Sequence, residues 1–312
     1  WWMEESTKSY YFIGKDNIPF HAIIWPAELI GISTTFDEML NSKNPRSLIL
    51  PFDVPANEFM NLEGKKISGS RNWAVYGRDF LTRYDPDSLR YYLTVTMPES
   101  RDTDWDWGDF MHRNNDELVA TWGNLANRVL SFAYKYWEGI VPDPGELTDL
   151  ELQLLATVND GFERVGKEIE AVHLRAAVQE AMRIASEVNK YLDTTSPWVT
   201  IKSDKDTAAR AIFTAMKAID SLKILFAPFL PFSSEKLHLF MGYENSLFGT
   251  QSTQTRDDNL GEHTVLRYHP ESGTGKWFPS QLKNGDKFLK PLPLFKKLDP
   301  TIVDDERQRL GG

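Results

Sequence analysis

Apolar side chains recur at helical spacing through the middle of the chain. Three sets repeat every three to four residues, which is the period of one helix face. Their members are Leu150, Leu154, Leu155, Val158, Phe162, Val165 and Ile169; Leu174, Ala177, Val178, Ala181, Ile184 and Val188; and Ile212, Ala215, Ile219, Leu222, Leu225 and Phe226. With a long helix over Asp109–Tyr136 and a shorter one around Leu237–Met241, this pattern predicts an antiparallel helical bundle at residues 109–245.

The first 72 residues have a different pattern, which is typical of an α/β sheet. Tyr10–Ile13 and Ser47–Phe52 are short apolar runs that predict buried strands. Gly14 ends the first run, and an apolar helix through residues 21–30 follows. A strand, a glycine turn and a helix build the ligand-binding edge of open sheets. This region is therefore predicted to be half of a Rossmann-type nucleotide-binding sheet.

Two shorter regions complete the chain. Residues 73–108 combine a strand-like run at Trp73–Tyr76 with a capped helix over Asp85–Leu93, which predicts a small α/β connector. Residues 246–312 are polar from Gly249 to Gly261 and are expected to form a loop followed by a tail. The expected fold class is thus α/β plus all-α.

Composition and charge narrow the function. The 312 residues carry a net charge of −10, which argues against broad, non-specific binding of nucleic acid. The absence of cysteine excludes disulfides and thiolate zinc ligands, and we expect no zinc site within the chain. No apolar run approaches the ~20 residues that span a bilayer, and no signal peptide is visible. We therefore expect a cytoplasmic protein with no membrane partner.

The stretch Gly64–Asn72 is the strongest candidate for chemistry. Its cationic and hydroxyl side chains are those of Lys65, Lys66, Arg71, Ser68 and Ser70. Ammonium, guanidinium and hydroxyl groups donate hydrogen bonds to anions, and the glycines let backbone N–H groups turn toward them. Such a loop suits a polyphosphate. The alternative is an ordinary basic turn on the surface.

Polar residues also follow the first predicted strand. An aspartate at that position, Asp16, can accept hydrogen bonds from ribose hydroxyls, although Asp16 or Asn17 could equally cap the next helix. His21 and Trp25 are four residues apart and share one helix face. They line either a binding site or the apolar core.

The predicted bundle carries a second group of candidates. Asn124 and Arg128 are one helical turn apart and present hydrogen-bond donors toward one point. Trp198 follows Pro197 in a turn, where a nucleobase could stack on its ring. The alternative is that Trp198 closes the bundle end and Arg128 is a solvated ion-pair partner.

Two motifs resemble a known family. Ile13-Gly14-Lys15-Asp16-Asn17-Ile18-Pro19-Phe20-His21, followed by Trp25-Pro26, is similar to the adenosine- and methionine-binding segment of the methionyl-tRNA synthetases, and Lys66–Ser70 resembles the K-M-S-K-S loop of class I synthetases. The resemblance implies that the ATP site comprises Gly14, Asp16, Lys65, Lys66 and Arg71, that the methionine pocket comprises Asn17, His21 and Trp25, and that Lys66, Ser68 and Ser70 are catalytic. It implies ATP as a substrate, with Mg²⁺ on its phosphates.

The sequence departs from the family pattern in two respects. Gly69 stands where the family has the second lysine of its loop, which is credited with stabilising the leaving pyrophosphate. Lys65 or Arg71 is expected to substitute for it. The H-I-G-H signature of the family is absent from all 312 residues. We therefore expect the C-terminal part of a methionyl-tRNA synthetase, without the first half of its catalytic domain and inactive by itself.

The resemblance extends to the bundle and the tail. Asn124-x-x-x-Arg128 and Pro197-Trp198 match the positions at which the family reads the CAU anticodon, and Leu289–Phe295 resembles its terminal peptide, which packs back on the catalytic part. The implied partners are tRNA(Met), L-methionine and ATP, and we expect a monomer. Two alternatives stay open: a sister synthetase for Ile, Leu, Val or Cys, and a stand-alone tRNA-binding module without catalysis.

Overall fold

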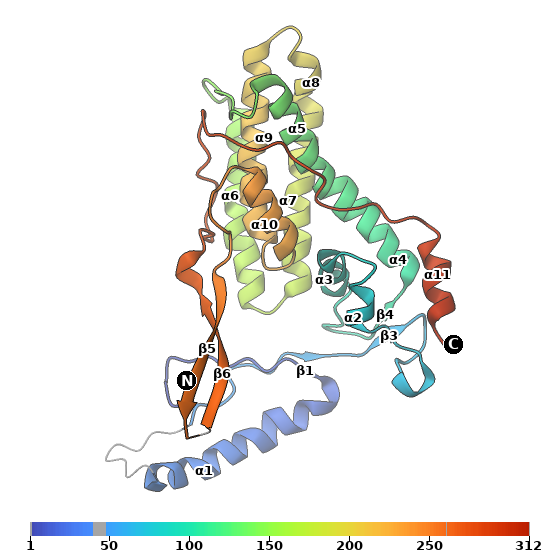
Figure 1. Cartoon of the computed structure of the whole chain (residues 1–312), viewed down its shortest axis with the longest axis vertical. Coiled ribbons are helices and arrows are strands. Elements are labelled where there is room, and N and C mark those ends of the chain that lie inside the picture. The colour runs from blue at the N-terminus through green and yellow to red at the C-terminus, as the bar shows by residue number, and fades with distance from the viewer. Residues whose placement is uncertain (1, 40–47, 260, 312) are drawn as a thin grey trace. The chain divides into compact units, whose positions relative to one another are not determined.

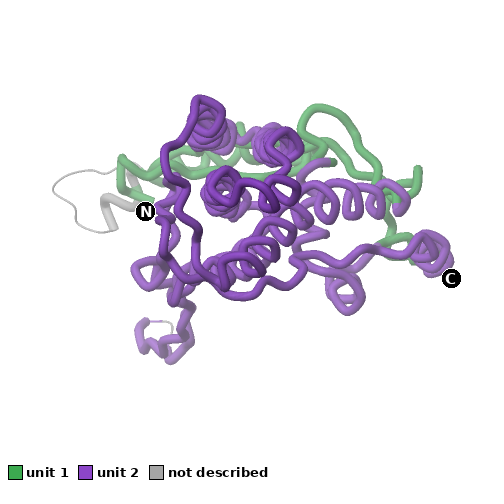
Figure 2. The backbone as a smooth tube through the Cα atoms, turned by 90° about the horizontal axis from the view of Figure 1, so that it is seen from above, with its two compact units in different colours: residues 1–74, 96–106, 311 green, residues 75–95, 107–310, 312 purple. Residues whose placement is uncertain are grey.

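The structure is a computed structural model that describes residues 2–39, 48–259 and 261–311 (Figure 1). The chain divides into two compact units (Figure 2). The first unit contains residues 1–74, 96–106 and 311, and the second contains residues 75–95, 107–310 and 312. The predicted connector at 73–108 therefore contributes to both units.

The first unit contains two short parallel strand pairs. Strand β1 (Ile13–Gly14) pairs with β2 (Ala56–Asn57), and β3 (Met60–Leu62) pairs with β4 (Thr103–Trp105). Leu62 and Trp105 are buried at the end of the second pair. Parallel pairing is typical of α/β sheets, and the expected fold class is confirmed.

Three of the predicted strands are wrong in extent. Tyr10 forms only an isolated bridge to Asp53, so the first strand is confined to β1. Residues 48–52 form no strand, and Ser47 lies outside the described residues. In the third run, Trp73–Tyr76, only Trp73 forms a bridge. An apolar run becomes a strand only where a neighbour pairs with its backbone, and sequence pattern does not show that neighbour.

A helix follows β1, as predicted, but it begins in an unusual form. A 3₁₀ turn η1 (Lys15–Asn17) and a π-helical turn η2 (Phe20–Ile24) lead into α1 (Trp25–Met39). Short π segments occur mostly as insertions at functional sites. Leu29 is buried on the inner face of α1.

The second unit begins with a small aromatic core. It lies among α2 (Gly77–Phe80), α3 (Pro86–Val95) and α4 (Trp107–His112), and α3 confirms the predicted capped helix. The aromatic rings that contact one another are those of Phe80, Tyr84, Tyr92, Trp107 and Phe110. Asp87, buried on α3, accepts the backbone N–H of Ser233 at 2.6 Å, so one helix holds the start of another.

The predicted bundle is present and occupies most of the second unit (Figure 1). Its helices are α5 (Asn124–Trp137), α6 (Asp149–Glu170), α7 (Leu174–Thr195), α9 (Lys205–Phe226) and α10 (Pro231–Phe240), with a single turn α8 (Pro197–Thr200) between α7 and α9. The predicted helix at 109–136 is continuous, but its middle is a π-helix, η4 (Arg113–Gly123). The last predicted helix, around Leu237–Met241, is longer than expected and corresponds to α10.

Capping residues mark the starts of two bundle helices, and a glycine permits close packing between helices. Thr148 and Glu151 form a capping box at the start of α6, and Asp204 accepts the N–H of Thr207 at the start of α9. Gly161 lets α6 approach its neighbours, because a Cβ there would lie 2.5 Å from Ile184 Cδ1. Such caps are encoded locally, although the prediction of these helices used only their apolar period.

The predicted loop at Gly249–Gly261 is wrong. Strand β5 (Thr250–Asp258) pairs antiparallel with β6 (Gly261–His269), and a 3₁₀ turn η5 (Pro270–Ser272) follows. Every residue of β5 is exposed, so the strand lacks the apolar alternation by which strands are recognised in sequence.

The tail packs along the second unit and ends in helix α11 (Ile302–Arg309). Leu289 donates its N–H to the Phe240 carbonyl, and the side chains of Phe288 and Phe295 are buried. The buried Glu306 of α11 accepts hydrogen bonds from Arg83 at 2.7 Å and Tyr84 at 2.8 Å. Among the described helices of the chain, none is both long and apolar enough to cross a membrane.

Candidate functional site

The Gly64–Asn72 loop is entered through a tight turn. Leu62 and Lys65 exchange both backbone hydrogen bonds, at 2.8 and 3.0 Å. Glu63 and Gly64 have φ values of 48° and 72°, as the central residues of a type I′ turn require. The carboxylate of Asp104 accepts the Gly64 N–H at 2.9 Å, so an acidic residue anchors the basic loop.

An indole ring fixes the other side of the loop. Trp73 Nε1 donates to the Leu62 carbonyl at 2.8 Å, and the backbones of Trp73 and Ser68 exchange two further hydrogen bonds. The Lys65 ammonium lies 4.3 Å from the centroid of the Trp73 ring, a cation–π distance. The loop is thus a closed, pinned structure rather than a loose turn.

The loop's remaining polar groups point outward. Lys66, Ser70 and Arg71 are exposed, and the hydroxyls of Ser68 and Ser70 lie 3.2 Å apart across the 3₁₀ turn η3 (Gly69–Arg71). Side-chain cations and paired hydroxyls on one rigid loop can bind the oxygens of a polyphosphate. Lys65 is exposed as well, and its ammonium lies against the Trp73 ring.

The segment after β1 presents its backbone and carboxylate openly. In the described part of the chain, and apart from the neighbouring residues in sequence, no heavy atom lies within 4 Å of the position a Cβ would take at Gly14, and Asp16 is exposed. Neither Asp16 nor Asn17 caps the following helix, whose N-cap is Pro19 without a side-chain hydrogen bond. The capping alternative for Asp16 and Asn17 is therefore not realised.

Lys15 ties this segment to the rest of the first unit. Its ammonium pairs with Glu58 and, at 3.1 Å, with Asp102. The hydrogen bonds to Glu58 and then to Asp102 raise the pKa of Lys15 above its ordinary value. The ammoniums of Lys15 and Lys66 lie 4.5 and 5.9 Å from the same Phe59 ring. That ring links the segment after β1 with the basic loop.

Tyr11 contacts two of the three residues predicted to line the methionine pocket, His21 and Trp25. Its ring centroid lies 5.8 Å from that of His21, and its hydroxyl accepts a hydrogen bond from Trp25 Nε1 at 3.4 Å. His21 Nδ1 lies 3.2 Å from the Asn17 carbonyl. A carbonyl only accepts, so Nδ1 carries a proton and Nε2 is left for other partners.

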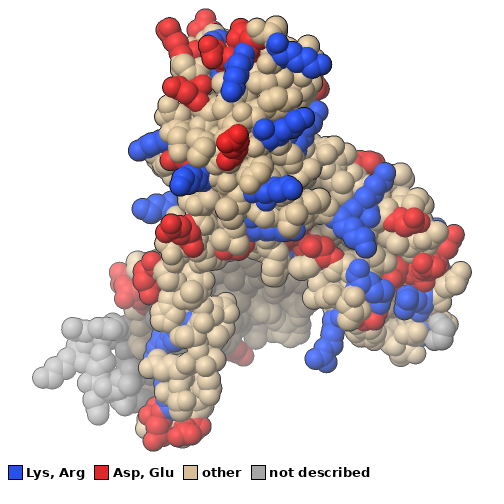
Figure 3. Space-filling view, turned by 45° about the horizontal axis from the view of Figure 1, so that its top comes forward, with Lys and Arg blue, Asp and Glu red and all other residues tan. Residues whose placement is uncertain are grey.

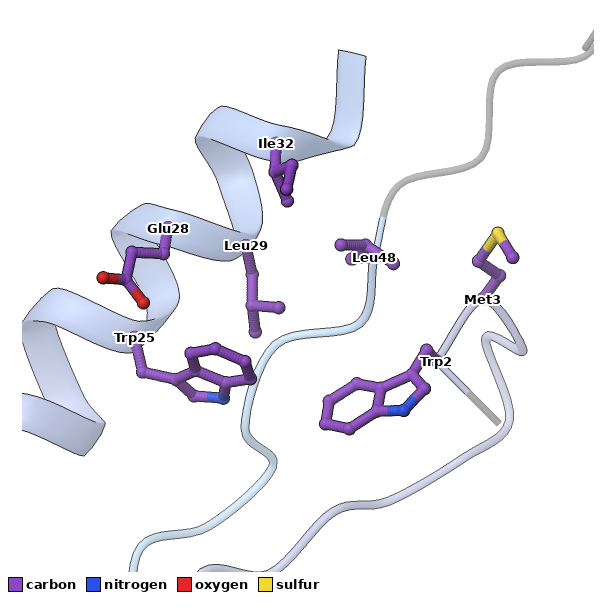
Figure 4. Close-up of a pocket in the computed structure, with 7 residues that line it drawn as sticks. All are labelled: Trp2, Met3, Trp25, Glu28, Leu29, Ile32 and Leu48. Carbon is purple, nitrogen blue, oxygen red and sulfur yellow. The ribbon is translucent and has the colours of Figure 1, made fainter. Parts of the chain in front are cut away.

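An apolar cavity of about 600 Å³ adjoins Trp25 (Figure 4). Trp2 and Trp25 both line it, with their rings edge to face and the centroids 6.1 Å apart, and Leu29 and Leu48 contribute aliphatic walls. The described part of the cavity wall is mostly hydrocarbon, with Glu28 at its edge. Trp25 therefore lies between the polar side chain of His21 and the apolar cavity.

In the bundle, the structure joins Arg128 of α5 to Trp198 of α8. The guanidinium carbon lies 4.4 Å from the centroid of the indole, and both side chains are half-buried. Asn124 is exposed one helical turn before Arg128. On the visible face of the bundle, basic and acidic side chains are interspersed (Figure 3). Recognition there would depend on specific groups rather than on a basic field.

Several residues at these sites escaped the sequence analysis. They are Tyr11, Phe59, Trp73 and Asp104 in the first unit and Asn189 in the second. Tyr11 is predicted only as part of a strand, and Asp104 only as part of the connector. Neither carried a sequence signal for its contact. Among the described residues, no group of three or more His, Asp or Glu side chains could hold a metal ion.

Comparison with known proteins first identifies the class. Residues 1–130 match the family model described as class I tRNA synthetases (M). The apo structure of the Mycobacterium tuberculosis methionyl-tRNA synthetase superposes with a TM-score of 0.72 at 24% identity, covering 94% of this chain and 50% of that one. The fold is that of a class I aminoacyl-tRNA synthetase.

Closer matches identify the family within that class. Residues 141–265 match the anticodon binding domain of methionyl tRNA ligase. The methionine–tRNA ligases of Thermomicrobium roseum and Chloroflexus aurantiacus are 50% and 46% identical over 99% of this chain. The chain belongs to the methionyl-tRNA synthetase family, as the motifs predicted. It spans about half the length of the curated relatives it matches, 51% and 52%.

A ligand-bound relative is also similar. The M. tuberculosis methionyl-tRNA synthetase in complex with methionyl-adenylate superposes with a TM-score of 0.70 at 26% identity, covering 92% of this chain and 50% of that one. These matches do not test single residues. The individual roles assigned to the loop, the segment after β1 and the bundle stay predictions.

Proposed function

We propose that the chain carries the ATP loop and the anticodon-reading part of a methionine–tRNA ligase. One observation supports this most directly: the Arg128 guanidinium lies over the Trp198 ring, although the two residues are far apart in sequence. A flat ring and a planar set of donors are what reading an unpaired base requires. Residues 1–72, 73–108, 109–245 and 246–312 are proposed as catalytic part, connector, anticodon domain and tail.

The first reaction joins methionine to ATP. The methionine carboxylate attacks the α-phosphorus, the bond to the β-phosphate oxygen breaks, and pyrophosphate leaves with that electron pair. We assign ATP binding to Gly14, Asp16, Lys65, Lys66 and Arg71. Lys66, Ser68 and Ser70 act on the phosphates, because donors fixed before the reaction stabilise charge as it develops. Mg²⁺ is expected on the ATP phosphates, as the resemblance to the family implies.

Methionine is proposed to bind beside the segment after β1. Asn17, His21 and Trp25 were assigned from the motif, and Tyr11 supports the last two by its ring contact and hydroxyl. An indole wall suits a thioether, which makes favourable contacts with aromatic rings. The exposed Asn17 and the Nε2 atom of His21 offer polar groups nearby.

The second reaction charges tRNA(Met). A terminal ribose hydroxyl attacks the methionyl carbonyl, the acyl–phosphate bond breaks, and AMP leaves. The substrate is selected at the CAU anticodon: Trp198 stacks on the first base, and Asn124 and Arg128 hydrogen-bond to base edges. Few contacts can suffice on an acidic chain, because the selection does not depend on net charge.

The alternatives have less support. A sister synthetase for Ile, Leu, Val or Cys would not be expected to match a methionyl-specific anticodon model and methionine–tRNA ligases along almost the whole chain. A stand-alone tRNA-binding module leaves the pinned phosphate loop without a purpose. We further propose a monomer in the cytoplasm; a solution mass near 35.9 kDa would agree, and twice that mass would contradict it.

The test is binding of the chain to RNA stem-loops that carry a CAU or a GAU anticodon. We expect preference for CAU, and Trp198→Ala should weaken CAU binding by roughly 5- to 150-fold, since stacking on an aromatic side chain contributes ~1–3 kcal/mol per base. Trp137→Ala is the matched control, because Trp137 is also half-buried and has Lys205 at 5.9 Å from its ring. Equal binding of both RNAs would contradict the assignment of the bundle as the anticodon reader.

A further inference from the structure

Asn189 of α7 connects the Arg128 side chain to the bundle backbone. Its Oδ1 accepts a hydrogen bond from Arg128 Nη2 at 3.4 Å. Its Nδ2 donates to the carbonyls of Thr121 at 3.0 Å and Ala185 at 3.2 Å. One half-buried amide thus reaches α5, its own helix and the π-helix η4.

The two carbonyls fix which way this amide faces. A backbone carbonyl only accepts hydrogen bonds, so the NH₂ group of Asn189 must be directed at Thr121 and Ala185. The oxygen is left facing the guanidinium, which only donates. The acceptor presented to Arg128 is therefore set by the fold and does not depend on a free rotation of the amide.

The position of Thr121 adds to this rigidity. Thr121 lies in the last turn of η4, and its hydroxyl donates to the Asp116 carbonyl five residues earlier at 2.9 Å. The backbone N–H of Asn124, the first residue of α5, donates to the Val119 carbonyl, also five residues earlier. Asn189 thus forms a hydrogen bond to the π-helical turn that directly precedes Asn124 and Arg128.

Arg128 consequently has contacts on two sides of its guanidinium. The Trp198 ring covers one face, and Asn189 holds one edge nitrogen. A free arginine side chain carries ~2 kcal/mol of rotamer entropy, part of which would be lost on binding a base. Because the guanidinium is already ordered before binding, less rotamer entropy is lost on binding a base, and the remaining N–H donors point in a fixed direction.

We propose that Asn189 is a positioning residue for anticodon recognition: it holds the Arg128 guanidinium against Trp198, so that the fork is aligned with the edge of the first anticodon base. This inference rests on the proposed function of the bundle. Asn189 touches Arg128 and not the RNA, so its effect is on discrimination between bases and passes through Arg128.

The test is a double-mutant cycle with the full chain and the CAU and GAU stem-loops. Asn189→Ala should reduce the ratio of the two affinities by roughly 3- to 10-fold, within the range of coupling between residues in contact. Arg128→Ala should reduce it at least as much, and the double variant should reduce it no further than Arg128→Ala alone. Asn159→Ala, at an exposed asparagine of α6, is the control and should leave the ratio unchanged.

Melting temperatures separate positioning from simple stabilisation. Asn189→Asp keeps an acceptor toward Arg128 but loses the donors to the two carbonyls, so it should lower the melting temperature while keeping the CAU preference. Two results would overturn the inference. One is that Asn189→Ala lowers the melting temperature but leaves the affinity ratio unchanged. The other is that the effects of Asn189→Ala and Arg128→Ala on the affinity ratio multiply in the double variant. If Trp198→Ala and Arg128→Ala lose the preference for CAU over GAU but Asn189→Ala keeps it, the role of Asn189 is overturned and the proposed function stands. No preference in the unmodified chain overturns the proposed function as well.

Discussion

A buried ion pair in the second unit allows a quantitative prediction. Asp220 and Lys223 of α9 are each 2% exposed, and their charged groups lie 2.6 Å apart. The second carboxylate oxygen accepts hydrogen bonds from Tyr243 at 2.8 Å and Ser280 at 2.6 Å. Lys223 also donates to Nδ1 of His238 at 3.0 Å. The network joins α9, α10 and the tail.

The perturbation is Asp220→Asn, which removes the charge and keeps the shape. Lys223 would then be a buried ammonium without its counter-ion, a change that costs about 3 kcal/mol of unfolding free energy. For a cooperative unit of this size, such a loss corresponds to a fall in melting temperature of roughly 6–12 °C. Asp206→Asn, at an exposed aspartate of the same helix, is the matched control and should change the melting temperature little.

The pH dependence tests the mechanism. Burial lowers the pKa of Lys223 below its ordinary value of 10.5, whereas the charge of Asp220 opposes that shift. Without Asp220 the folded-state pKa falls further. The cost of burying the ammonium is then fully present below the folded-state pKa and disappears as the pH rises toward 10.5. The melting-temperature gap between the original chain and Asp220→Asn should therefore narrow from pH 7 to about 9.5.

The assay is thermal unfolding followed by helical circular dichroism. A second substitution, Lys223→Met, added to Asp220→Asn removes the uncompensated charge and should restore part of the stability. The recovery should be incomplete, because Nδ1 of His238 loses the hydrogen bond from Lys223. Leaving a buried acceptor unpaired costs about 1–3 kcal/mol of unfolding free energy. An equal loss with and without Lys223→Met, or a gap that does not change with pH, would refute the reasoning.

Three further predictions follow from other parts of the structure. Burial and the positive charge of Lys223 lower the pKa of His238 from 6.5 to about 4. The free energy of unfolding should therefore be highest above pH 6.5 and decrease as the pH falls toward 4. Urea unfolding should show a smaller decrease over this pH range for His238→Gln. Gly161→Ala should cost about 1–3 kcal/mol by overpacking, because its Cβ would meet Ile184 at 2.5 Å, whereas Gly31→Ala, in open space, should not destabilise. The 312-residue chain alone should show no methionine-dependent ATP–pyrophosphate exchange, since it lacks the H-I-G-H signature; exchange above a blank without methionine would contradict this.

Elements that depend on neighbouring residues are predictable from this sequence, whereas strands that depend on distant partners are not. The bundle helices were predicted because their apolar period is a property of neighbouring residues. The wholly polar strand β5 was missed, and residues 48–52 were wrongly predicted as a strand, for the same reason. Whether a segment becomes a strand depends on a partner elsewhere in the chain.

The sequence by itself determined the family, the helical bundle and the chemical character of the Gly64–Asn72 loop. Each of these is written in motifs or periods that a short stretch contains. Only the tertiary structure decided that Trp73 and Asp104 pin that loop, and that Asn189 reaches Arg128 across 61 positions of sequence. Such contacts arise where packed elements happen to meet, and an asparagine or aspartate has no local signal that distinguishes a partner of this kind from a solvated side chain.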